Sequence, residues 1–267
     1  MVATMRPPSP EEFDAFHARG FFVRPDVFTG AEIQGMRRAF DGLERTARRL
    51  AEPALHRGAY FVVHGSRIDR IVWCGAAEPA LLDVGADPRL LAIAAGLLGS
   101  SEMSQLINQA HFKLPGDGVA FPWHQDSTHR RYGTPEWKDV NGRGSYVQTV
   151  IALDDVTEEN GPLEFIPGSC RRGHLGLVQG ALPVGVDATG AVAATMRSGS
   201  VLVFGPYTIH RSLPNGSAVP RRVFINGYAY PGANTRVYPG GGRGTHPALR
   251  GRAVPDGGLS VSGSAAR

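Results

Sequence analysis

The sequence predicts a mainly β protein with N-terminal helices, and two observations carry that prediction. Up to about residue 100, apolar residues recur at three- and four-residue steps between recognisable helix caps. After about residue 103, short runs of branched and aromatic residues alternate with Gly, Pro and Asn turns, a pattern typical of sandwiches and barrels rather than of βαβ units. Since no repeat or long linker divides the 267 residues, we expect residues 1–267 to form one domain.

Helix signals dominate the first part of the chain, over about residues 9–100. Ser9 before Pro10 and two glutamates predicts a capped helix N-terminus, and the Phe-Phe-Val run at 21–23 predicts a short strand. Thr29 precedes a long helix over 30–50, and a further helix begins after Asp87 and is ended by Gly99. The apolar stripe of the long helix consists of Ile33, Met36, Phe40 and Leu43. We therefore expect this part of the chain to be mostly helical.

Short strands are predicted throughout the second part, over about residues 103–231. The candidate strands lie at 103–114, 119–126, 145–153, 162–168, 199–205 and 221–230. Asn215-Gly216 is a strong signal for a tight turn between two antiparallel strands. The segment 239–267 is rich in Gly, Ala, Ser and Arg and offers little apolar surface to bury, so we expect it to be loose.

The composition favours a globular protein and argues against several classes. The net charge of +4 comes almost entirely from scattered arginines without a basic run, which is not typical of a nucleic-acid-binding face. No stretch approaches the roughly 18 consecutive apolar residues of a membrane span, and the first residues do not resemble a secretory signal. Cys74 and Cys170 provide no disulfide framework. We therefore expect a cytoplasmic protein that binds neither nucleic acid nor membranes.

The segment Trp123-His124-Gln125-Asp126 is the strongest candidate for a metal site. On an extended strand, residues two apart point to the same face, so His124 and Asp126 can present an imidazole nitrogen and a carboxylate oxygen to one point. His210, which we place at the end of a strand, is the best third donor. Two histidines and one carboxylate leave positions open for a cosubstrate and dioxygen, which suits Fe(II) better than zinc. A hydrogen-bonded His–Asp pair and an ordinary strand-end histidine are the structural alternatives.

Arg221 follows His210 beyond the Asn215-Gly216 turn. A hairpin at that turn would bring the guanidinium of Arg221 beside the metal. There its planar group of N–H donors could bind a carboxylate through two parallel hydrogen bonds. Arg222 is the rival, because strand alternation lets only one of the two face inward. A cosubstrate that bears a carboxylate and chelates the metal is the natural interpretation. The other histidines nearby, His111, His129 and His174, are expected to be neighbours of the site or surface residues.

These residues resemble the phytanoyl-CoA dioxygenase family of Fe(II)/2-oxoglutarate dioxygenases, which includes ectoine and some proline hydroxylases. The resemblance rests on the His-Gln-Asp motif, the distal histidine, the arginine eleven residues later and the segment 159–169, Glu-Asn-Gly-Pro-Leu-Glu-Phe-Ile-Pro-Gly-Ser. It extends over about residues 13–230. It implies a double-stranded β-helix (jelly-roll, cupin-like) core that N-terminal helices buttress.

The resemblance also implies roles for individual residues. The residues that match the family's catalytic iron ligands are His124, Asp126 and His210. Arg221 matches the arginine that binds the distal carboxylate of 2-oxoglutarate, and Ser212, Gln109 and Lys113 match further cosubstrate contacts. For Ser212 and Gln109 the alternative is a purely structural role. The carboxylate at Asp126 favours hydroxylation, because related halogenases carry a small residue there.

The implied reaction couples oxidative decarboxylation of 2-oxoglutarate by O2 to hydroxylation of an unactivated C–H bond of a small molecule, releasing succinate and CO2. The Trp-His-x-x-Asp-Gly-Met stretch that follows the motif in the ectoine and some proline enzymes is absent here, which argues against those two substrates. The alternative function is a cupin-like metal-binding protein that is not catalytic or does not use 2-oxoglutarate.

The loop at about 127–145 offers two interpretations of the substrate. Its basic residues could form a positive rim that attracts an anionic small molecule. These residues are Arg130, Arg131, Lys138 and Arg143. Alternatively, the loop is a lid whose Trp137 and Tyr132 close over an apolar substrate.

Overall fold

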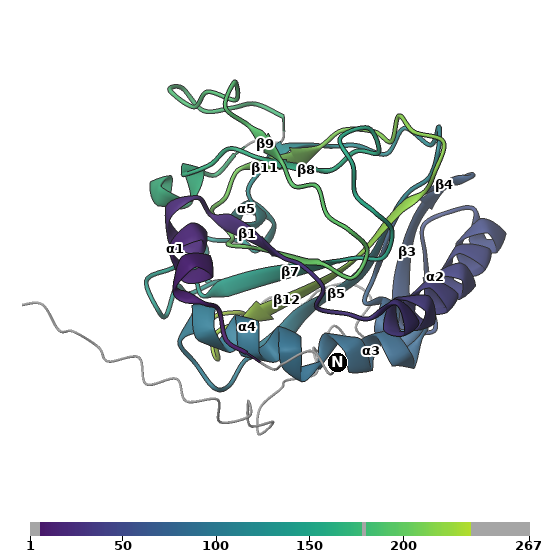
Figure 1. The fold of residues 1–267 in the computed structure, drawn as a ribbon, viewed down its shortest axis with the longest axis horizontal. Coiled ribbons are helices and arrows are strands. Elements are labelled where there is room, and N and C mark those ends of the chain that lie inside the picture. Colours follow the sequence, from purple (N-terminus) through teal and green to yellow (C-terminus); the bar gives the residue numbers. More distant parts are fainter. Residues whose placement is uncertain (1–5, 178–179, 236–267) are drawn as a thin grey trace, which may run out of the picture.

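Two antiparallel β-sheets face each other, and helices cover the outer face of the larger one (Figure 1). The computed structural model describes residues 6–177 and 180–235, so the segment 239–267 that we expected to be loose lies outside the described residues. This architecture is the predicted jelly roll with N-terminal helices. No helix in the described part of the chain is both long and apolar enough to cross a membrane.

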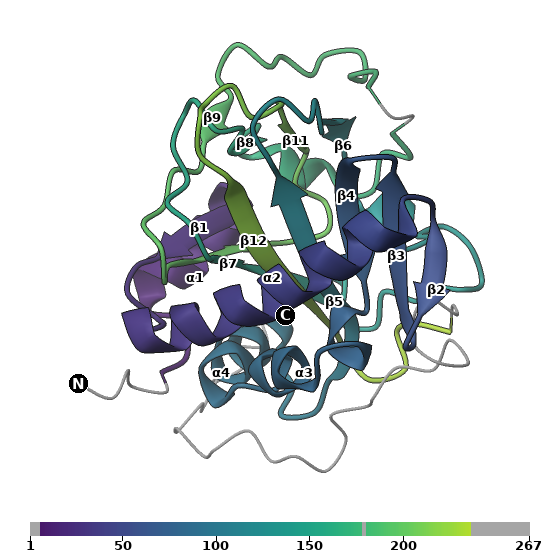
Figure 2. The ribbon, with the colours of Figure 1, turned by 90° about the vertical axis from the view of Figure 1, so that its right-hand side faces the viewer.

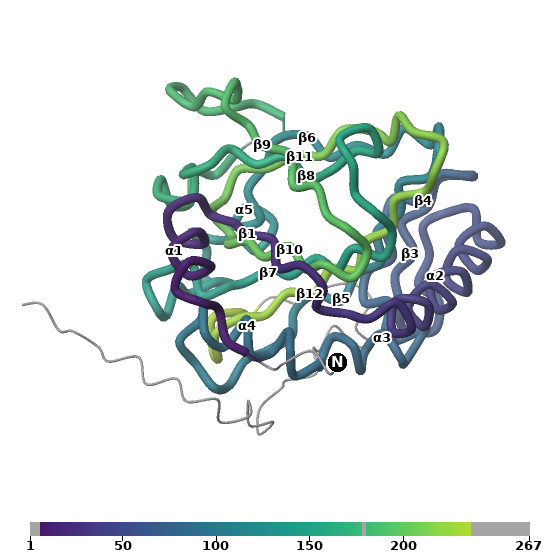
Figure 3. Tube along the Cα trace, viewed as in Figure 1, coloured from purple at the N-terminus to yellow at the C-terminus, as the bar shows by residue number. Residues whose placement is uncertain are grey.

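The large sheet has eight strands. Their spatial order is β1 (Phe21–Arg24), β10 (Val201–Phe204), β7 (Tyr146–Ala152), β12 (Arg221–Ala229), β5 (Ser104–Lys113), β4 (Arg67–Val72), β3 (Ala59–His64) and β2 (Ala54–His56). The N-terminal strand β1 runs beside β10 at one edge, so the beginning of the chain completes a sheet whose central strands come from much later residues (Figure 3).

The small sheet has four strands. Their order is β6 (Phe121–His124), β11 (His210–Ser212), β8 (Leu163–Phe165) and β9 (Val192–Ala193). Each of the six predicted strand segments contains one of the observed strands. In this sheet β9 and β11, with two and three residues, were not predicted, because strands this short show no alternating pattern of their own.

Cap signals predict some, but not all, of the α-helices in the described part of the chain. These helices are α1 (Pro10–Ala18), α2 (Gly30–Leu50), α3 (Pro79–Gly85), α4 (Pro88–Leu98) and the single turn α5 (Asp126–His129). Three helices, α1, α2 and α4, form where the cap signals predict them, whereas α3 and α5 were not predicted and have no side-chain cap. Ser9 and Thr29 each form a capping box with the glutamate three residues later, and Gly99 ends α4 in the left-handed conformation. Helix α2 lies across the outer face of the large sheet, with α3 and α4 beside it (Figure 2).

Two apolar layers hold these parts together. In the outer layer Phe40 of α2 is fully buried, with its ring 5.3 Å from that of Phe112 and 6.0 Å from that of Phe224. Burial of such a side chain stabilises the fold by about 1.5–3 kcal/mol. Between the sheets, Phe165 stacks on Phe21 at 4.4 Å and meets Phe204 edge-on at 5.2 Å. The inner layer therefore joins the sheets at one end, beside the cavity described below.

The structure corrects three local predictions. Residues 54–72, in the part expected to be mostly helical, form β2, β3 and β4 and extend the large sheet. His210 begins the separate strand β11 rather than ending the preceding one. Asn215-Gly216 is not a hairpin turn, because β11 and β12 belong to different sheets.

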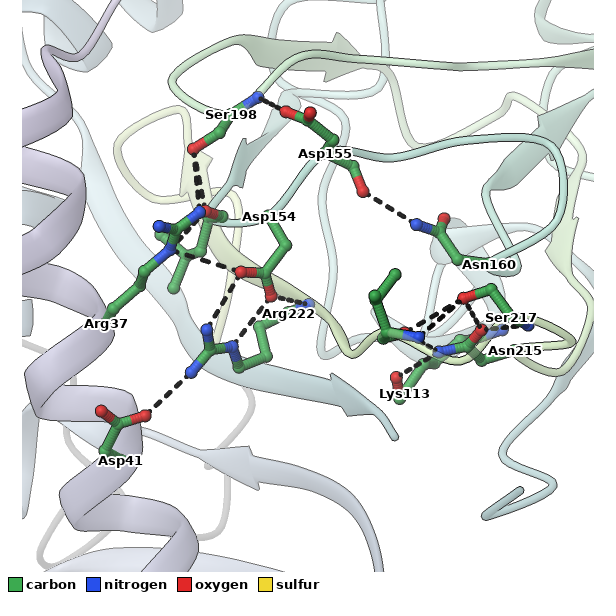
Figure 4. Close-up of polar contacts among 12 residues, drawn as sticks. Arg37, Asp41, Lys113, Asp154, Asp155, Asn160, Ser198, Asn215, Ser217 and Arg222 are labelled. Atoms are coloured by element: carbon green, nitrogen blue, oxygen red, sulfur yellow. Dashed lines mark hydrogen bonds and ion pairs between the residues drawn. The ribbon is translucent and has the colours of Figure 1, made fainter. Parts of the chain in front are cut away.

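The side chain of Asn215 explains why that turn differs. Its amide donates to the carbonyls of Lys113 at 2.9 Å and Val219 at 2.7 Å (Figure 4). Gly216 does not have the positive φ that the predicted hairpin turn would need. The segment between β11 and β12 therefore crosses from the small sheet to the large one, and Asn215 hydrogen-bonds it to the end of β5.

Candidate metal centre and cosubstrate pocket

His124, Asp126 and His210 meet at one point between the two sheets. One ligand atom from each lies within 4.8 Å of the other two. His124 ends β6 and His210 begins the adjacent strand β11, where the two residues are directly paired and their rings are 4.2 Å apart. Strand pairing thus brings together two histidines that are far apart in the sequence.

Both imidazole rings are oriented by backbone carbonyls. Nδ1 of His124 donates to the Pro122 carbonyl at 2.7 Å, and Nδ1 of His210 donates to the Thr208 carbonyl at 2.9 Å. A proton held on Nδ1 leaves the lone pair of Nε2 for a metal ion. Burial lowers the pKa of His210 to about 3, and the neighbouring His124 acts in the same direction. His210 is therefore neutral, as a metal ligand must be.

Asp126 reaches the same point by a route that differs slightly from the predicted one. Gln125 is extended, but Asp126 is the first residue of α5 rather than a strand residue. The side chain of Gln125 points the other way and donates to the carbonyls of Gly173 at 2.9 Å and Tyr207 at 2.6 Å. These contacts fix the peptide on which the spacing of His124 and Asp126 depends.

The carboxylate of Asp126 fits a metal ion. Its Oδ2 is buried and has no hydrogen-bond partner among the described residues, while Oδ1 lies 3.9 Å from Nε2 of His124. Burial alone would raise the pKa of Asp126, but Arg130 and the two histidines outweigh it, so the pKa lies below its usual value. An ionised, buried oxygen that faces two imidazole nitrogens is a ligand set for a divalent cation.

Arg221 and Arg222 point to opposite faces of β12. Arg221 is 4% exposed and lines the cavity that contains the three candidate ligands, where its Nη2 donates to the Gly161 carbonyl at 2.6 Å. Arg222 instead pairs with Asp154 at 2.8 Å and with Asp41 of α2 at 2.8 Å (Figure 4). The structure thus brings Arg221, and not its neighbour, to the predicted place.

The cavity has a volume of about 670 Å³ and lies between the two sheets. The apolar side chains that line it include Val72, Phe121, Leu163, Phe204, Val223 and Ile225. Its polar lining combines the three candidate metal ligands with several cationic side chains. Such a volume is ordinary for a small-molecule site, and a few converging polar groups in an apolar wall are what fixes a ligand's orientation.

Comparison with known proteins identifies the family. The family model for phytanoyl-CoA dioxygenase (PhyH) matches residues 16–223. The chain belongs to the phytanoyl-CoA dioxygenase family. The predicted family, the dioxygenase class and the cofactor set of Fe(II), 2-oxoglutarate and O2 are thereby confirmed.

Individual relatives agree with this assignment. The L-proline trans-4-hydroxylase of Streptomyces griseoviridis is 28% identical over 244 residues, covering 78% of this chain and 82% of that protein. The crystal structure of EvdO2 from Micromonospora carbonacea var. aurantiaca complexed with 2-oxoglutarate is 25% identical, with a TM-score of 0.65 over 85% of this chain and 94% of that one. The crystal structure of EctD from S. alaskensis with bound Fe is also 25% identical, with a TM-score of 0.64 over 83% and 76% of the two chains.

The other residues predicted to contact the cosubstrate line the same cavity. Ser212 lies on β11, two residues after His210, and Gln109 lies on β5, where its Oε1 is 3.0 Å from Nε2 of His111. Lys113 is paired directly with Arg221 across β5 and β12, and its Nζ donates to the Leu213 carbonyl. Burial and the adjacent Arg221 lower the pKa of Lys113 to about 6.

The loop at 127–145 differs from both predictions made for it. Of its basic residues, Arg130 and Arg131 line the cavity, whereas Lys138 and Arg143 are exposed and do not. Tyr132 and Trp137 stack on each other at 4.6 Å, and both are buried in the layer between the sheets. The predicted basic rim is therefore half correct, and the two aromatic residues are packed in the core instead of forming a lid.

Several cavity residues were not among the predicted site residues. Asp69 and Arg70 of β4 line the cavity, as does Thr128 of α5. Their sequence signal was weak, because β4 itself was not predicted. The alternation of buried residues along β3, at Ala59, Phe61 and Val63, could have revealed this hairpin.

Proposed function

We propose that His124, Asp126 and His210 hold Fe(II) in this enzyme, and that it hydroxylates an unactivated C–H bond of a small molecule. The observation that carries the proposal is the buried carboxylate of Asp126 beside two imidazoles whose Nδ1 atoms are fixed by backbone carbonyls, with an Oδ2 that has no partner among the described residues. The proline hydroxylase relative supports a small-molecule substrate. When bound, iron supplies the coupled oxidation of 2-oxoglutarate and substrate by O2, with release of succinate and CO2.

The side chains around the metal then have separate tasks. Arg221 binds the distal carboxylate of 2-oxoglutarate through its guanidinium, because it is buried, charged and has no carboxylate partner among the described residues. Ser212, Gln109 and Lys113 line the same cavity and position the cosubstrate. Asp126 fills the protein's third ligand position with a carboxylate, which supports hydroxylation rather than halogenation.

The apolar wall of the cavity keeps water from the reacting groups. Phe204 and Phe165 pack edge-to-face or stacked against the His210 ring, at 4.8 Å and 5.5 Å between centroids. A dry environment strengthens the ion pair between Arg221 and the cosubstrate, since water screens it less.

The free thiols of Cys74 and Cys170 support a further proposal, that the enzyme acts in a reducing compartment, the cytoplasm.

An anaerobic titration tests the proposal. Fe(II) and then 2-oxoglutarate are added to the protein, and the weak visible charge-transfer band of the iron–2-oxoglutarate chelate is recorded. We expect the band in the intact protein, and succinate formation once O2 is admitted. A protein that binds Fe(II) but gives no band at saturating 2-oxoglutarate would instead be a cupin-like metal-binding protein.

A further inference from the structure

Arg70 is a cavity residue to which the proposed reaction gives no role. It lies on β4 opposite His111 of β5 and lines the cavity. Burial lowers the pKa of Arg70, and the neighbouring Asp69 opposes that change, so the guanidinium remains charged although it is half-buried. Within residues 6–177 and 180–235 its side chain forms no hydrogen bond or ion pair.

Five other buried or half-buried arginines of the described residues are paired with carboxylates. These pairs are Arg24 with Glu12, Arg37 with Asp154, Arg89 with Glu32, Arg211 with Glu164, and Arg222 with Asp154. Arg221 is different, since within the described residues it has only a backbone carbonyl, and we assign it a carboxylate of the cosubstrate. A partly desolvated guanidinium without a partner is costly. By the same reasoning, Arg70 faces the place of a second anion.

The place in front of Arg70 is separate from the cosubstrate clamp. Arg221 pairs with Lys113 on β5, and Arg70 pairs with His111 on the other side of that strand. Two inter-strand spacings therefore separate the two arginines across the sheet, about 10 Å, with a further offset along the strands. Arg70 and Arg221 thus do not bind the same carboxylate group.

Arg130 brings a further positive charge to the cavity lining. Its guanidinium lies 5.0 Å from the centre of the Tyr146 ring, and its Nη2 donates to the Tyr146 hydroxyl at 3.2 Å. Arg70 and Arg130 both act electrostatically on His129, whose ring is 5.3 Å from that of the candidate ligand His124. An anion beside Arg70 would therefore lie on the same side of the cavity as the candidate metal ligand His124.

The charges that line the cavity do not balance. The cationic side chains are Arg70, Arg130, Arg131 and Arg221, and the carboxylates are Asp69 and Asp126. Lys113 is mostly neutral at pH 7 because of its lowered pKa, and Arg131 pairs with Glu136 at 3.7 Å. Asp69 already pairs with Arg67 at 2.8 Å, and Asp126 faces the metal. A metal dication and one 2-oxoglutarate dianion add no net charge, so the cavity stays positive when both are bound.

We propose that Arg70 binds a carboxylate of the substrate, and that this enzyme hydroxylates a small carboxylic acid. The inference rests on the proposed function and adds the substrate class to it. A guanidinium offers two parallel N–H donors that match a carboxylate, so Arg70 both selects the acid and fixes its orientation toward the metal.

The test uses the full-length protein with Fe(II) and saturating 2-oxoglutarate, without oxygen. L-proline, L-leucine, hexanoate and benzoate are each titrated beside their own carboxamides, and the change in the chelate band is recorded. We expect at least one acid to perturb the band and to bind at least tenfold more tightly than its amide. Arg70→Gln should weaken that acid tenfold to a hundredfold, because a charge-assisted bidentate contact is lost. Arg70→Lys should fall between the two.

Arg57→Gln is the control, since Arg57 lies in the turn between β2 and β3 of the same sheet, is exposed and does not line the cavity. It should bind the acid as the unmodified protein does. In every variant the affinity for 2-oxoglutarate should stay within about twofold, which also shows that the site is folded. Acids and amides that act alike, acids that leave the band unchanged, or an Arg70→Gln variant with unchanged acid affinity would each overturn the inference. Absence of the band in the unmodified protein would instead refute the proposed function.

Discussion

Replacement of Arg221 by alanine tests the cosubstrate site most directly. In the structure this guanidinium is buried, keeps one hydrogen bond to the Gly161 carbonyl and has an Nε without a partner among the described residues. Its positive charge therefore has no carboxylate partner in that part of the chain until the cosubstrate arrives. The three candidate metal ligands do not contact it through any hydrogen bond or ion pair of the described residues. The variant should thus weaken 2-oxoglutarate and leave metal binding nearly intact.

The expected size of the effect follows from the type of contact. A hydrogen-bonded ion pair is worth about 1.5–3 kcal/mol, and about 1.4 kcal/mol corresponds to a factor of ten in affinity. Arg221→Ala should therefore raise the dissociation constant of 2-oxoglutarate about tenfold to a hundredfold. The assay is the anaerobic titration of the Fe(II) protein with 2-oxoglutarate, followed through the chelate band, with Fe(II) affinity measured separately.

Arg222→Ala is the matched control, because it removes the same side chain one residue away on the opposite face of β12. Its partner Asp154 keeps Arg37 at 3.3 Å, so we expect a loss of about 1–3 kcal/mol in the free energy of unfolding. The affinity for 2-oxoglutarate should not change. If Arg222→Ala weakens 2-oxoglutarate and Arg221→Ala does not, the assignment of the clamp is refuted.

Three further predictions concern the metal, the packing and the protonation of the site. His210→Ala should abolish the chelate band, and a variant with full iron affinity and turnover would contradict the proposed ligand set. Gly227→Ala should lower the free energy of unfolding, measured with urea, by about 1–3 kcal/mol or more, because a Cβ there would lie 1.9 Å from the Tyr146 hydroxyl; an unchanged midpoint would disprove this packing. Lys113→Met should stabilise the cosubstrate-free protein at pH 7. The stability of the unmodified protein should rise between about pH 6 and pH 10, since its unfolded chain holds the Lys113 proton and its folded form does not. That rise should be smaller in the variant, and equal slopes in urea titrations at several pH values would count against a buried neutral lysine.

Local signals explain which elements the sequence predicts. Helix α2 was predicted from its Thr29 cap and its apolar stripe, and the structure buries all four residues of that stripe. Strands of seven or more residues, such as β5 and β12, carry enough branched and aromatic residues to stand out. The β2–β4 segment was missed because it follows a long helix directly and its first strand has three residues. Short elements depend on the strands they pair with, which lie elsewhere in the chain.

At Asn215-Gly216 the local sequence signal is strong, and the prediction made from it is nevertheless wrong. Its sequence favours a hairpin, but Asn215 hydrogen-bonds to the end of β5, and these contacts redirect the chain to the other sheet. Arg221 still lines the predicted cavity, because the cavity lies between the sheets and receives side chains from both. The predicted hairpin is thus wrong, while the assignment of Arg221 to the cosubstrate stays a prediction. A family motif predicts which side chains share a site, and it does not predict the course of the backbone between them.

Substrate recognition depends on a different kind of information. Arg70 faces the cavity only because β4 pairs with β5 in the register that sets it opposite His111, and neither strand carries a local signal for that register. The candidate metal ligands, in contrast, come from two short segments whose residue types and spacing match what coordination chemistry requires. Coordination geometry tolerates few alternatives, whereas an anion can be bound by an arginine from any strand that borders the cavity. The cofactor chemistry can therefore be predicted from sequence motifs, while the acid that we propose as substrate follows only from the folded sheet.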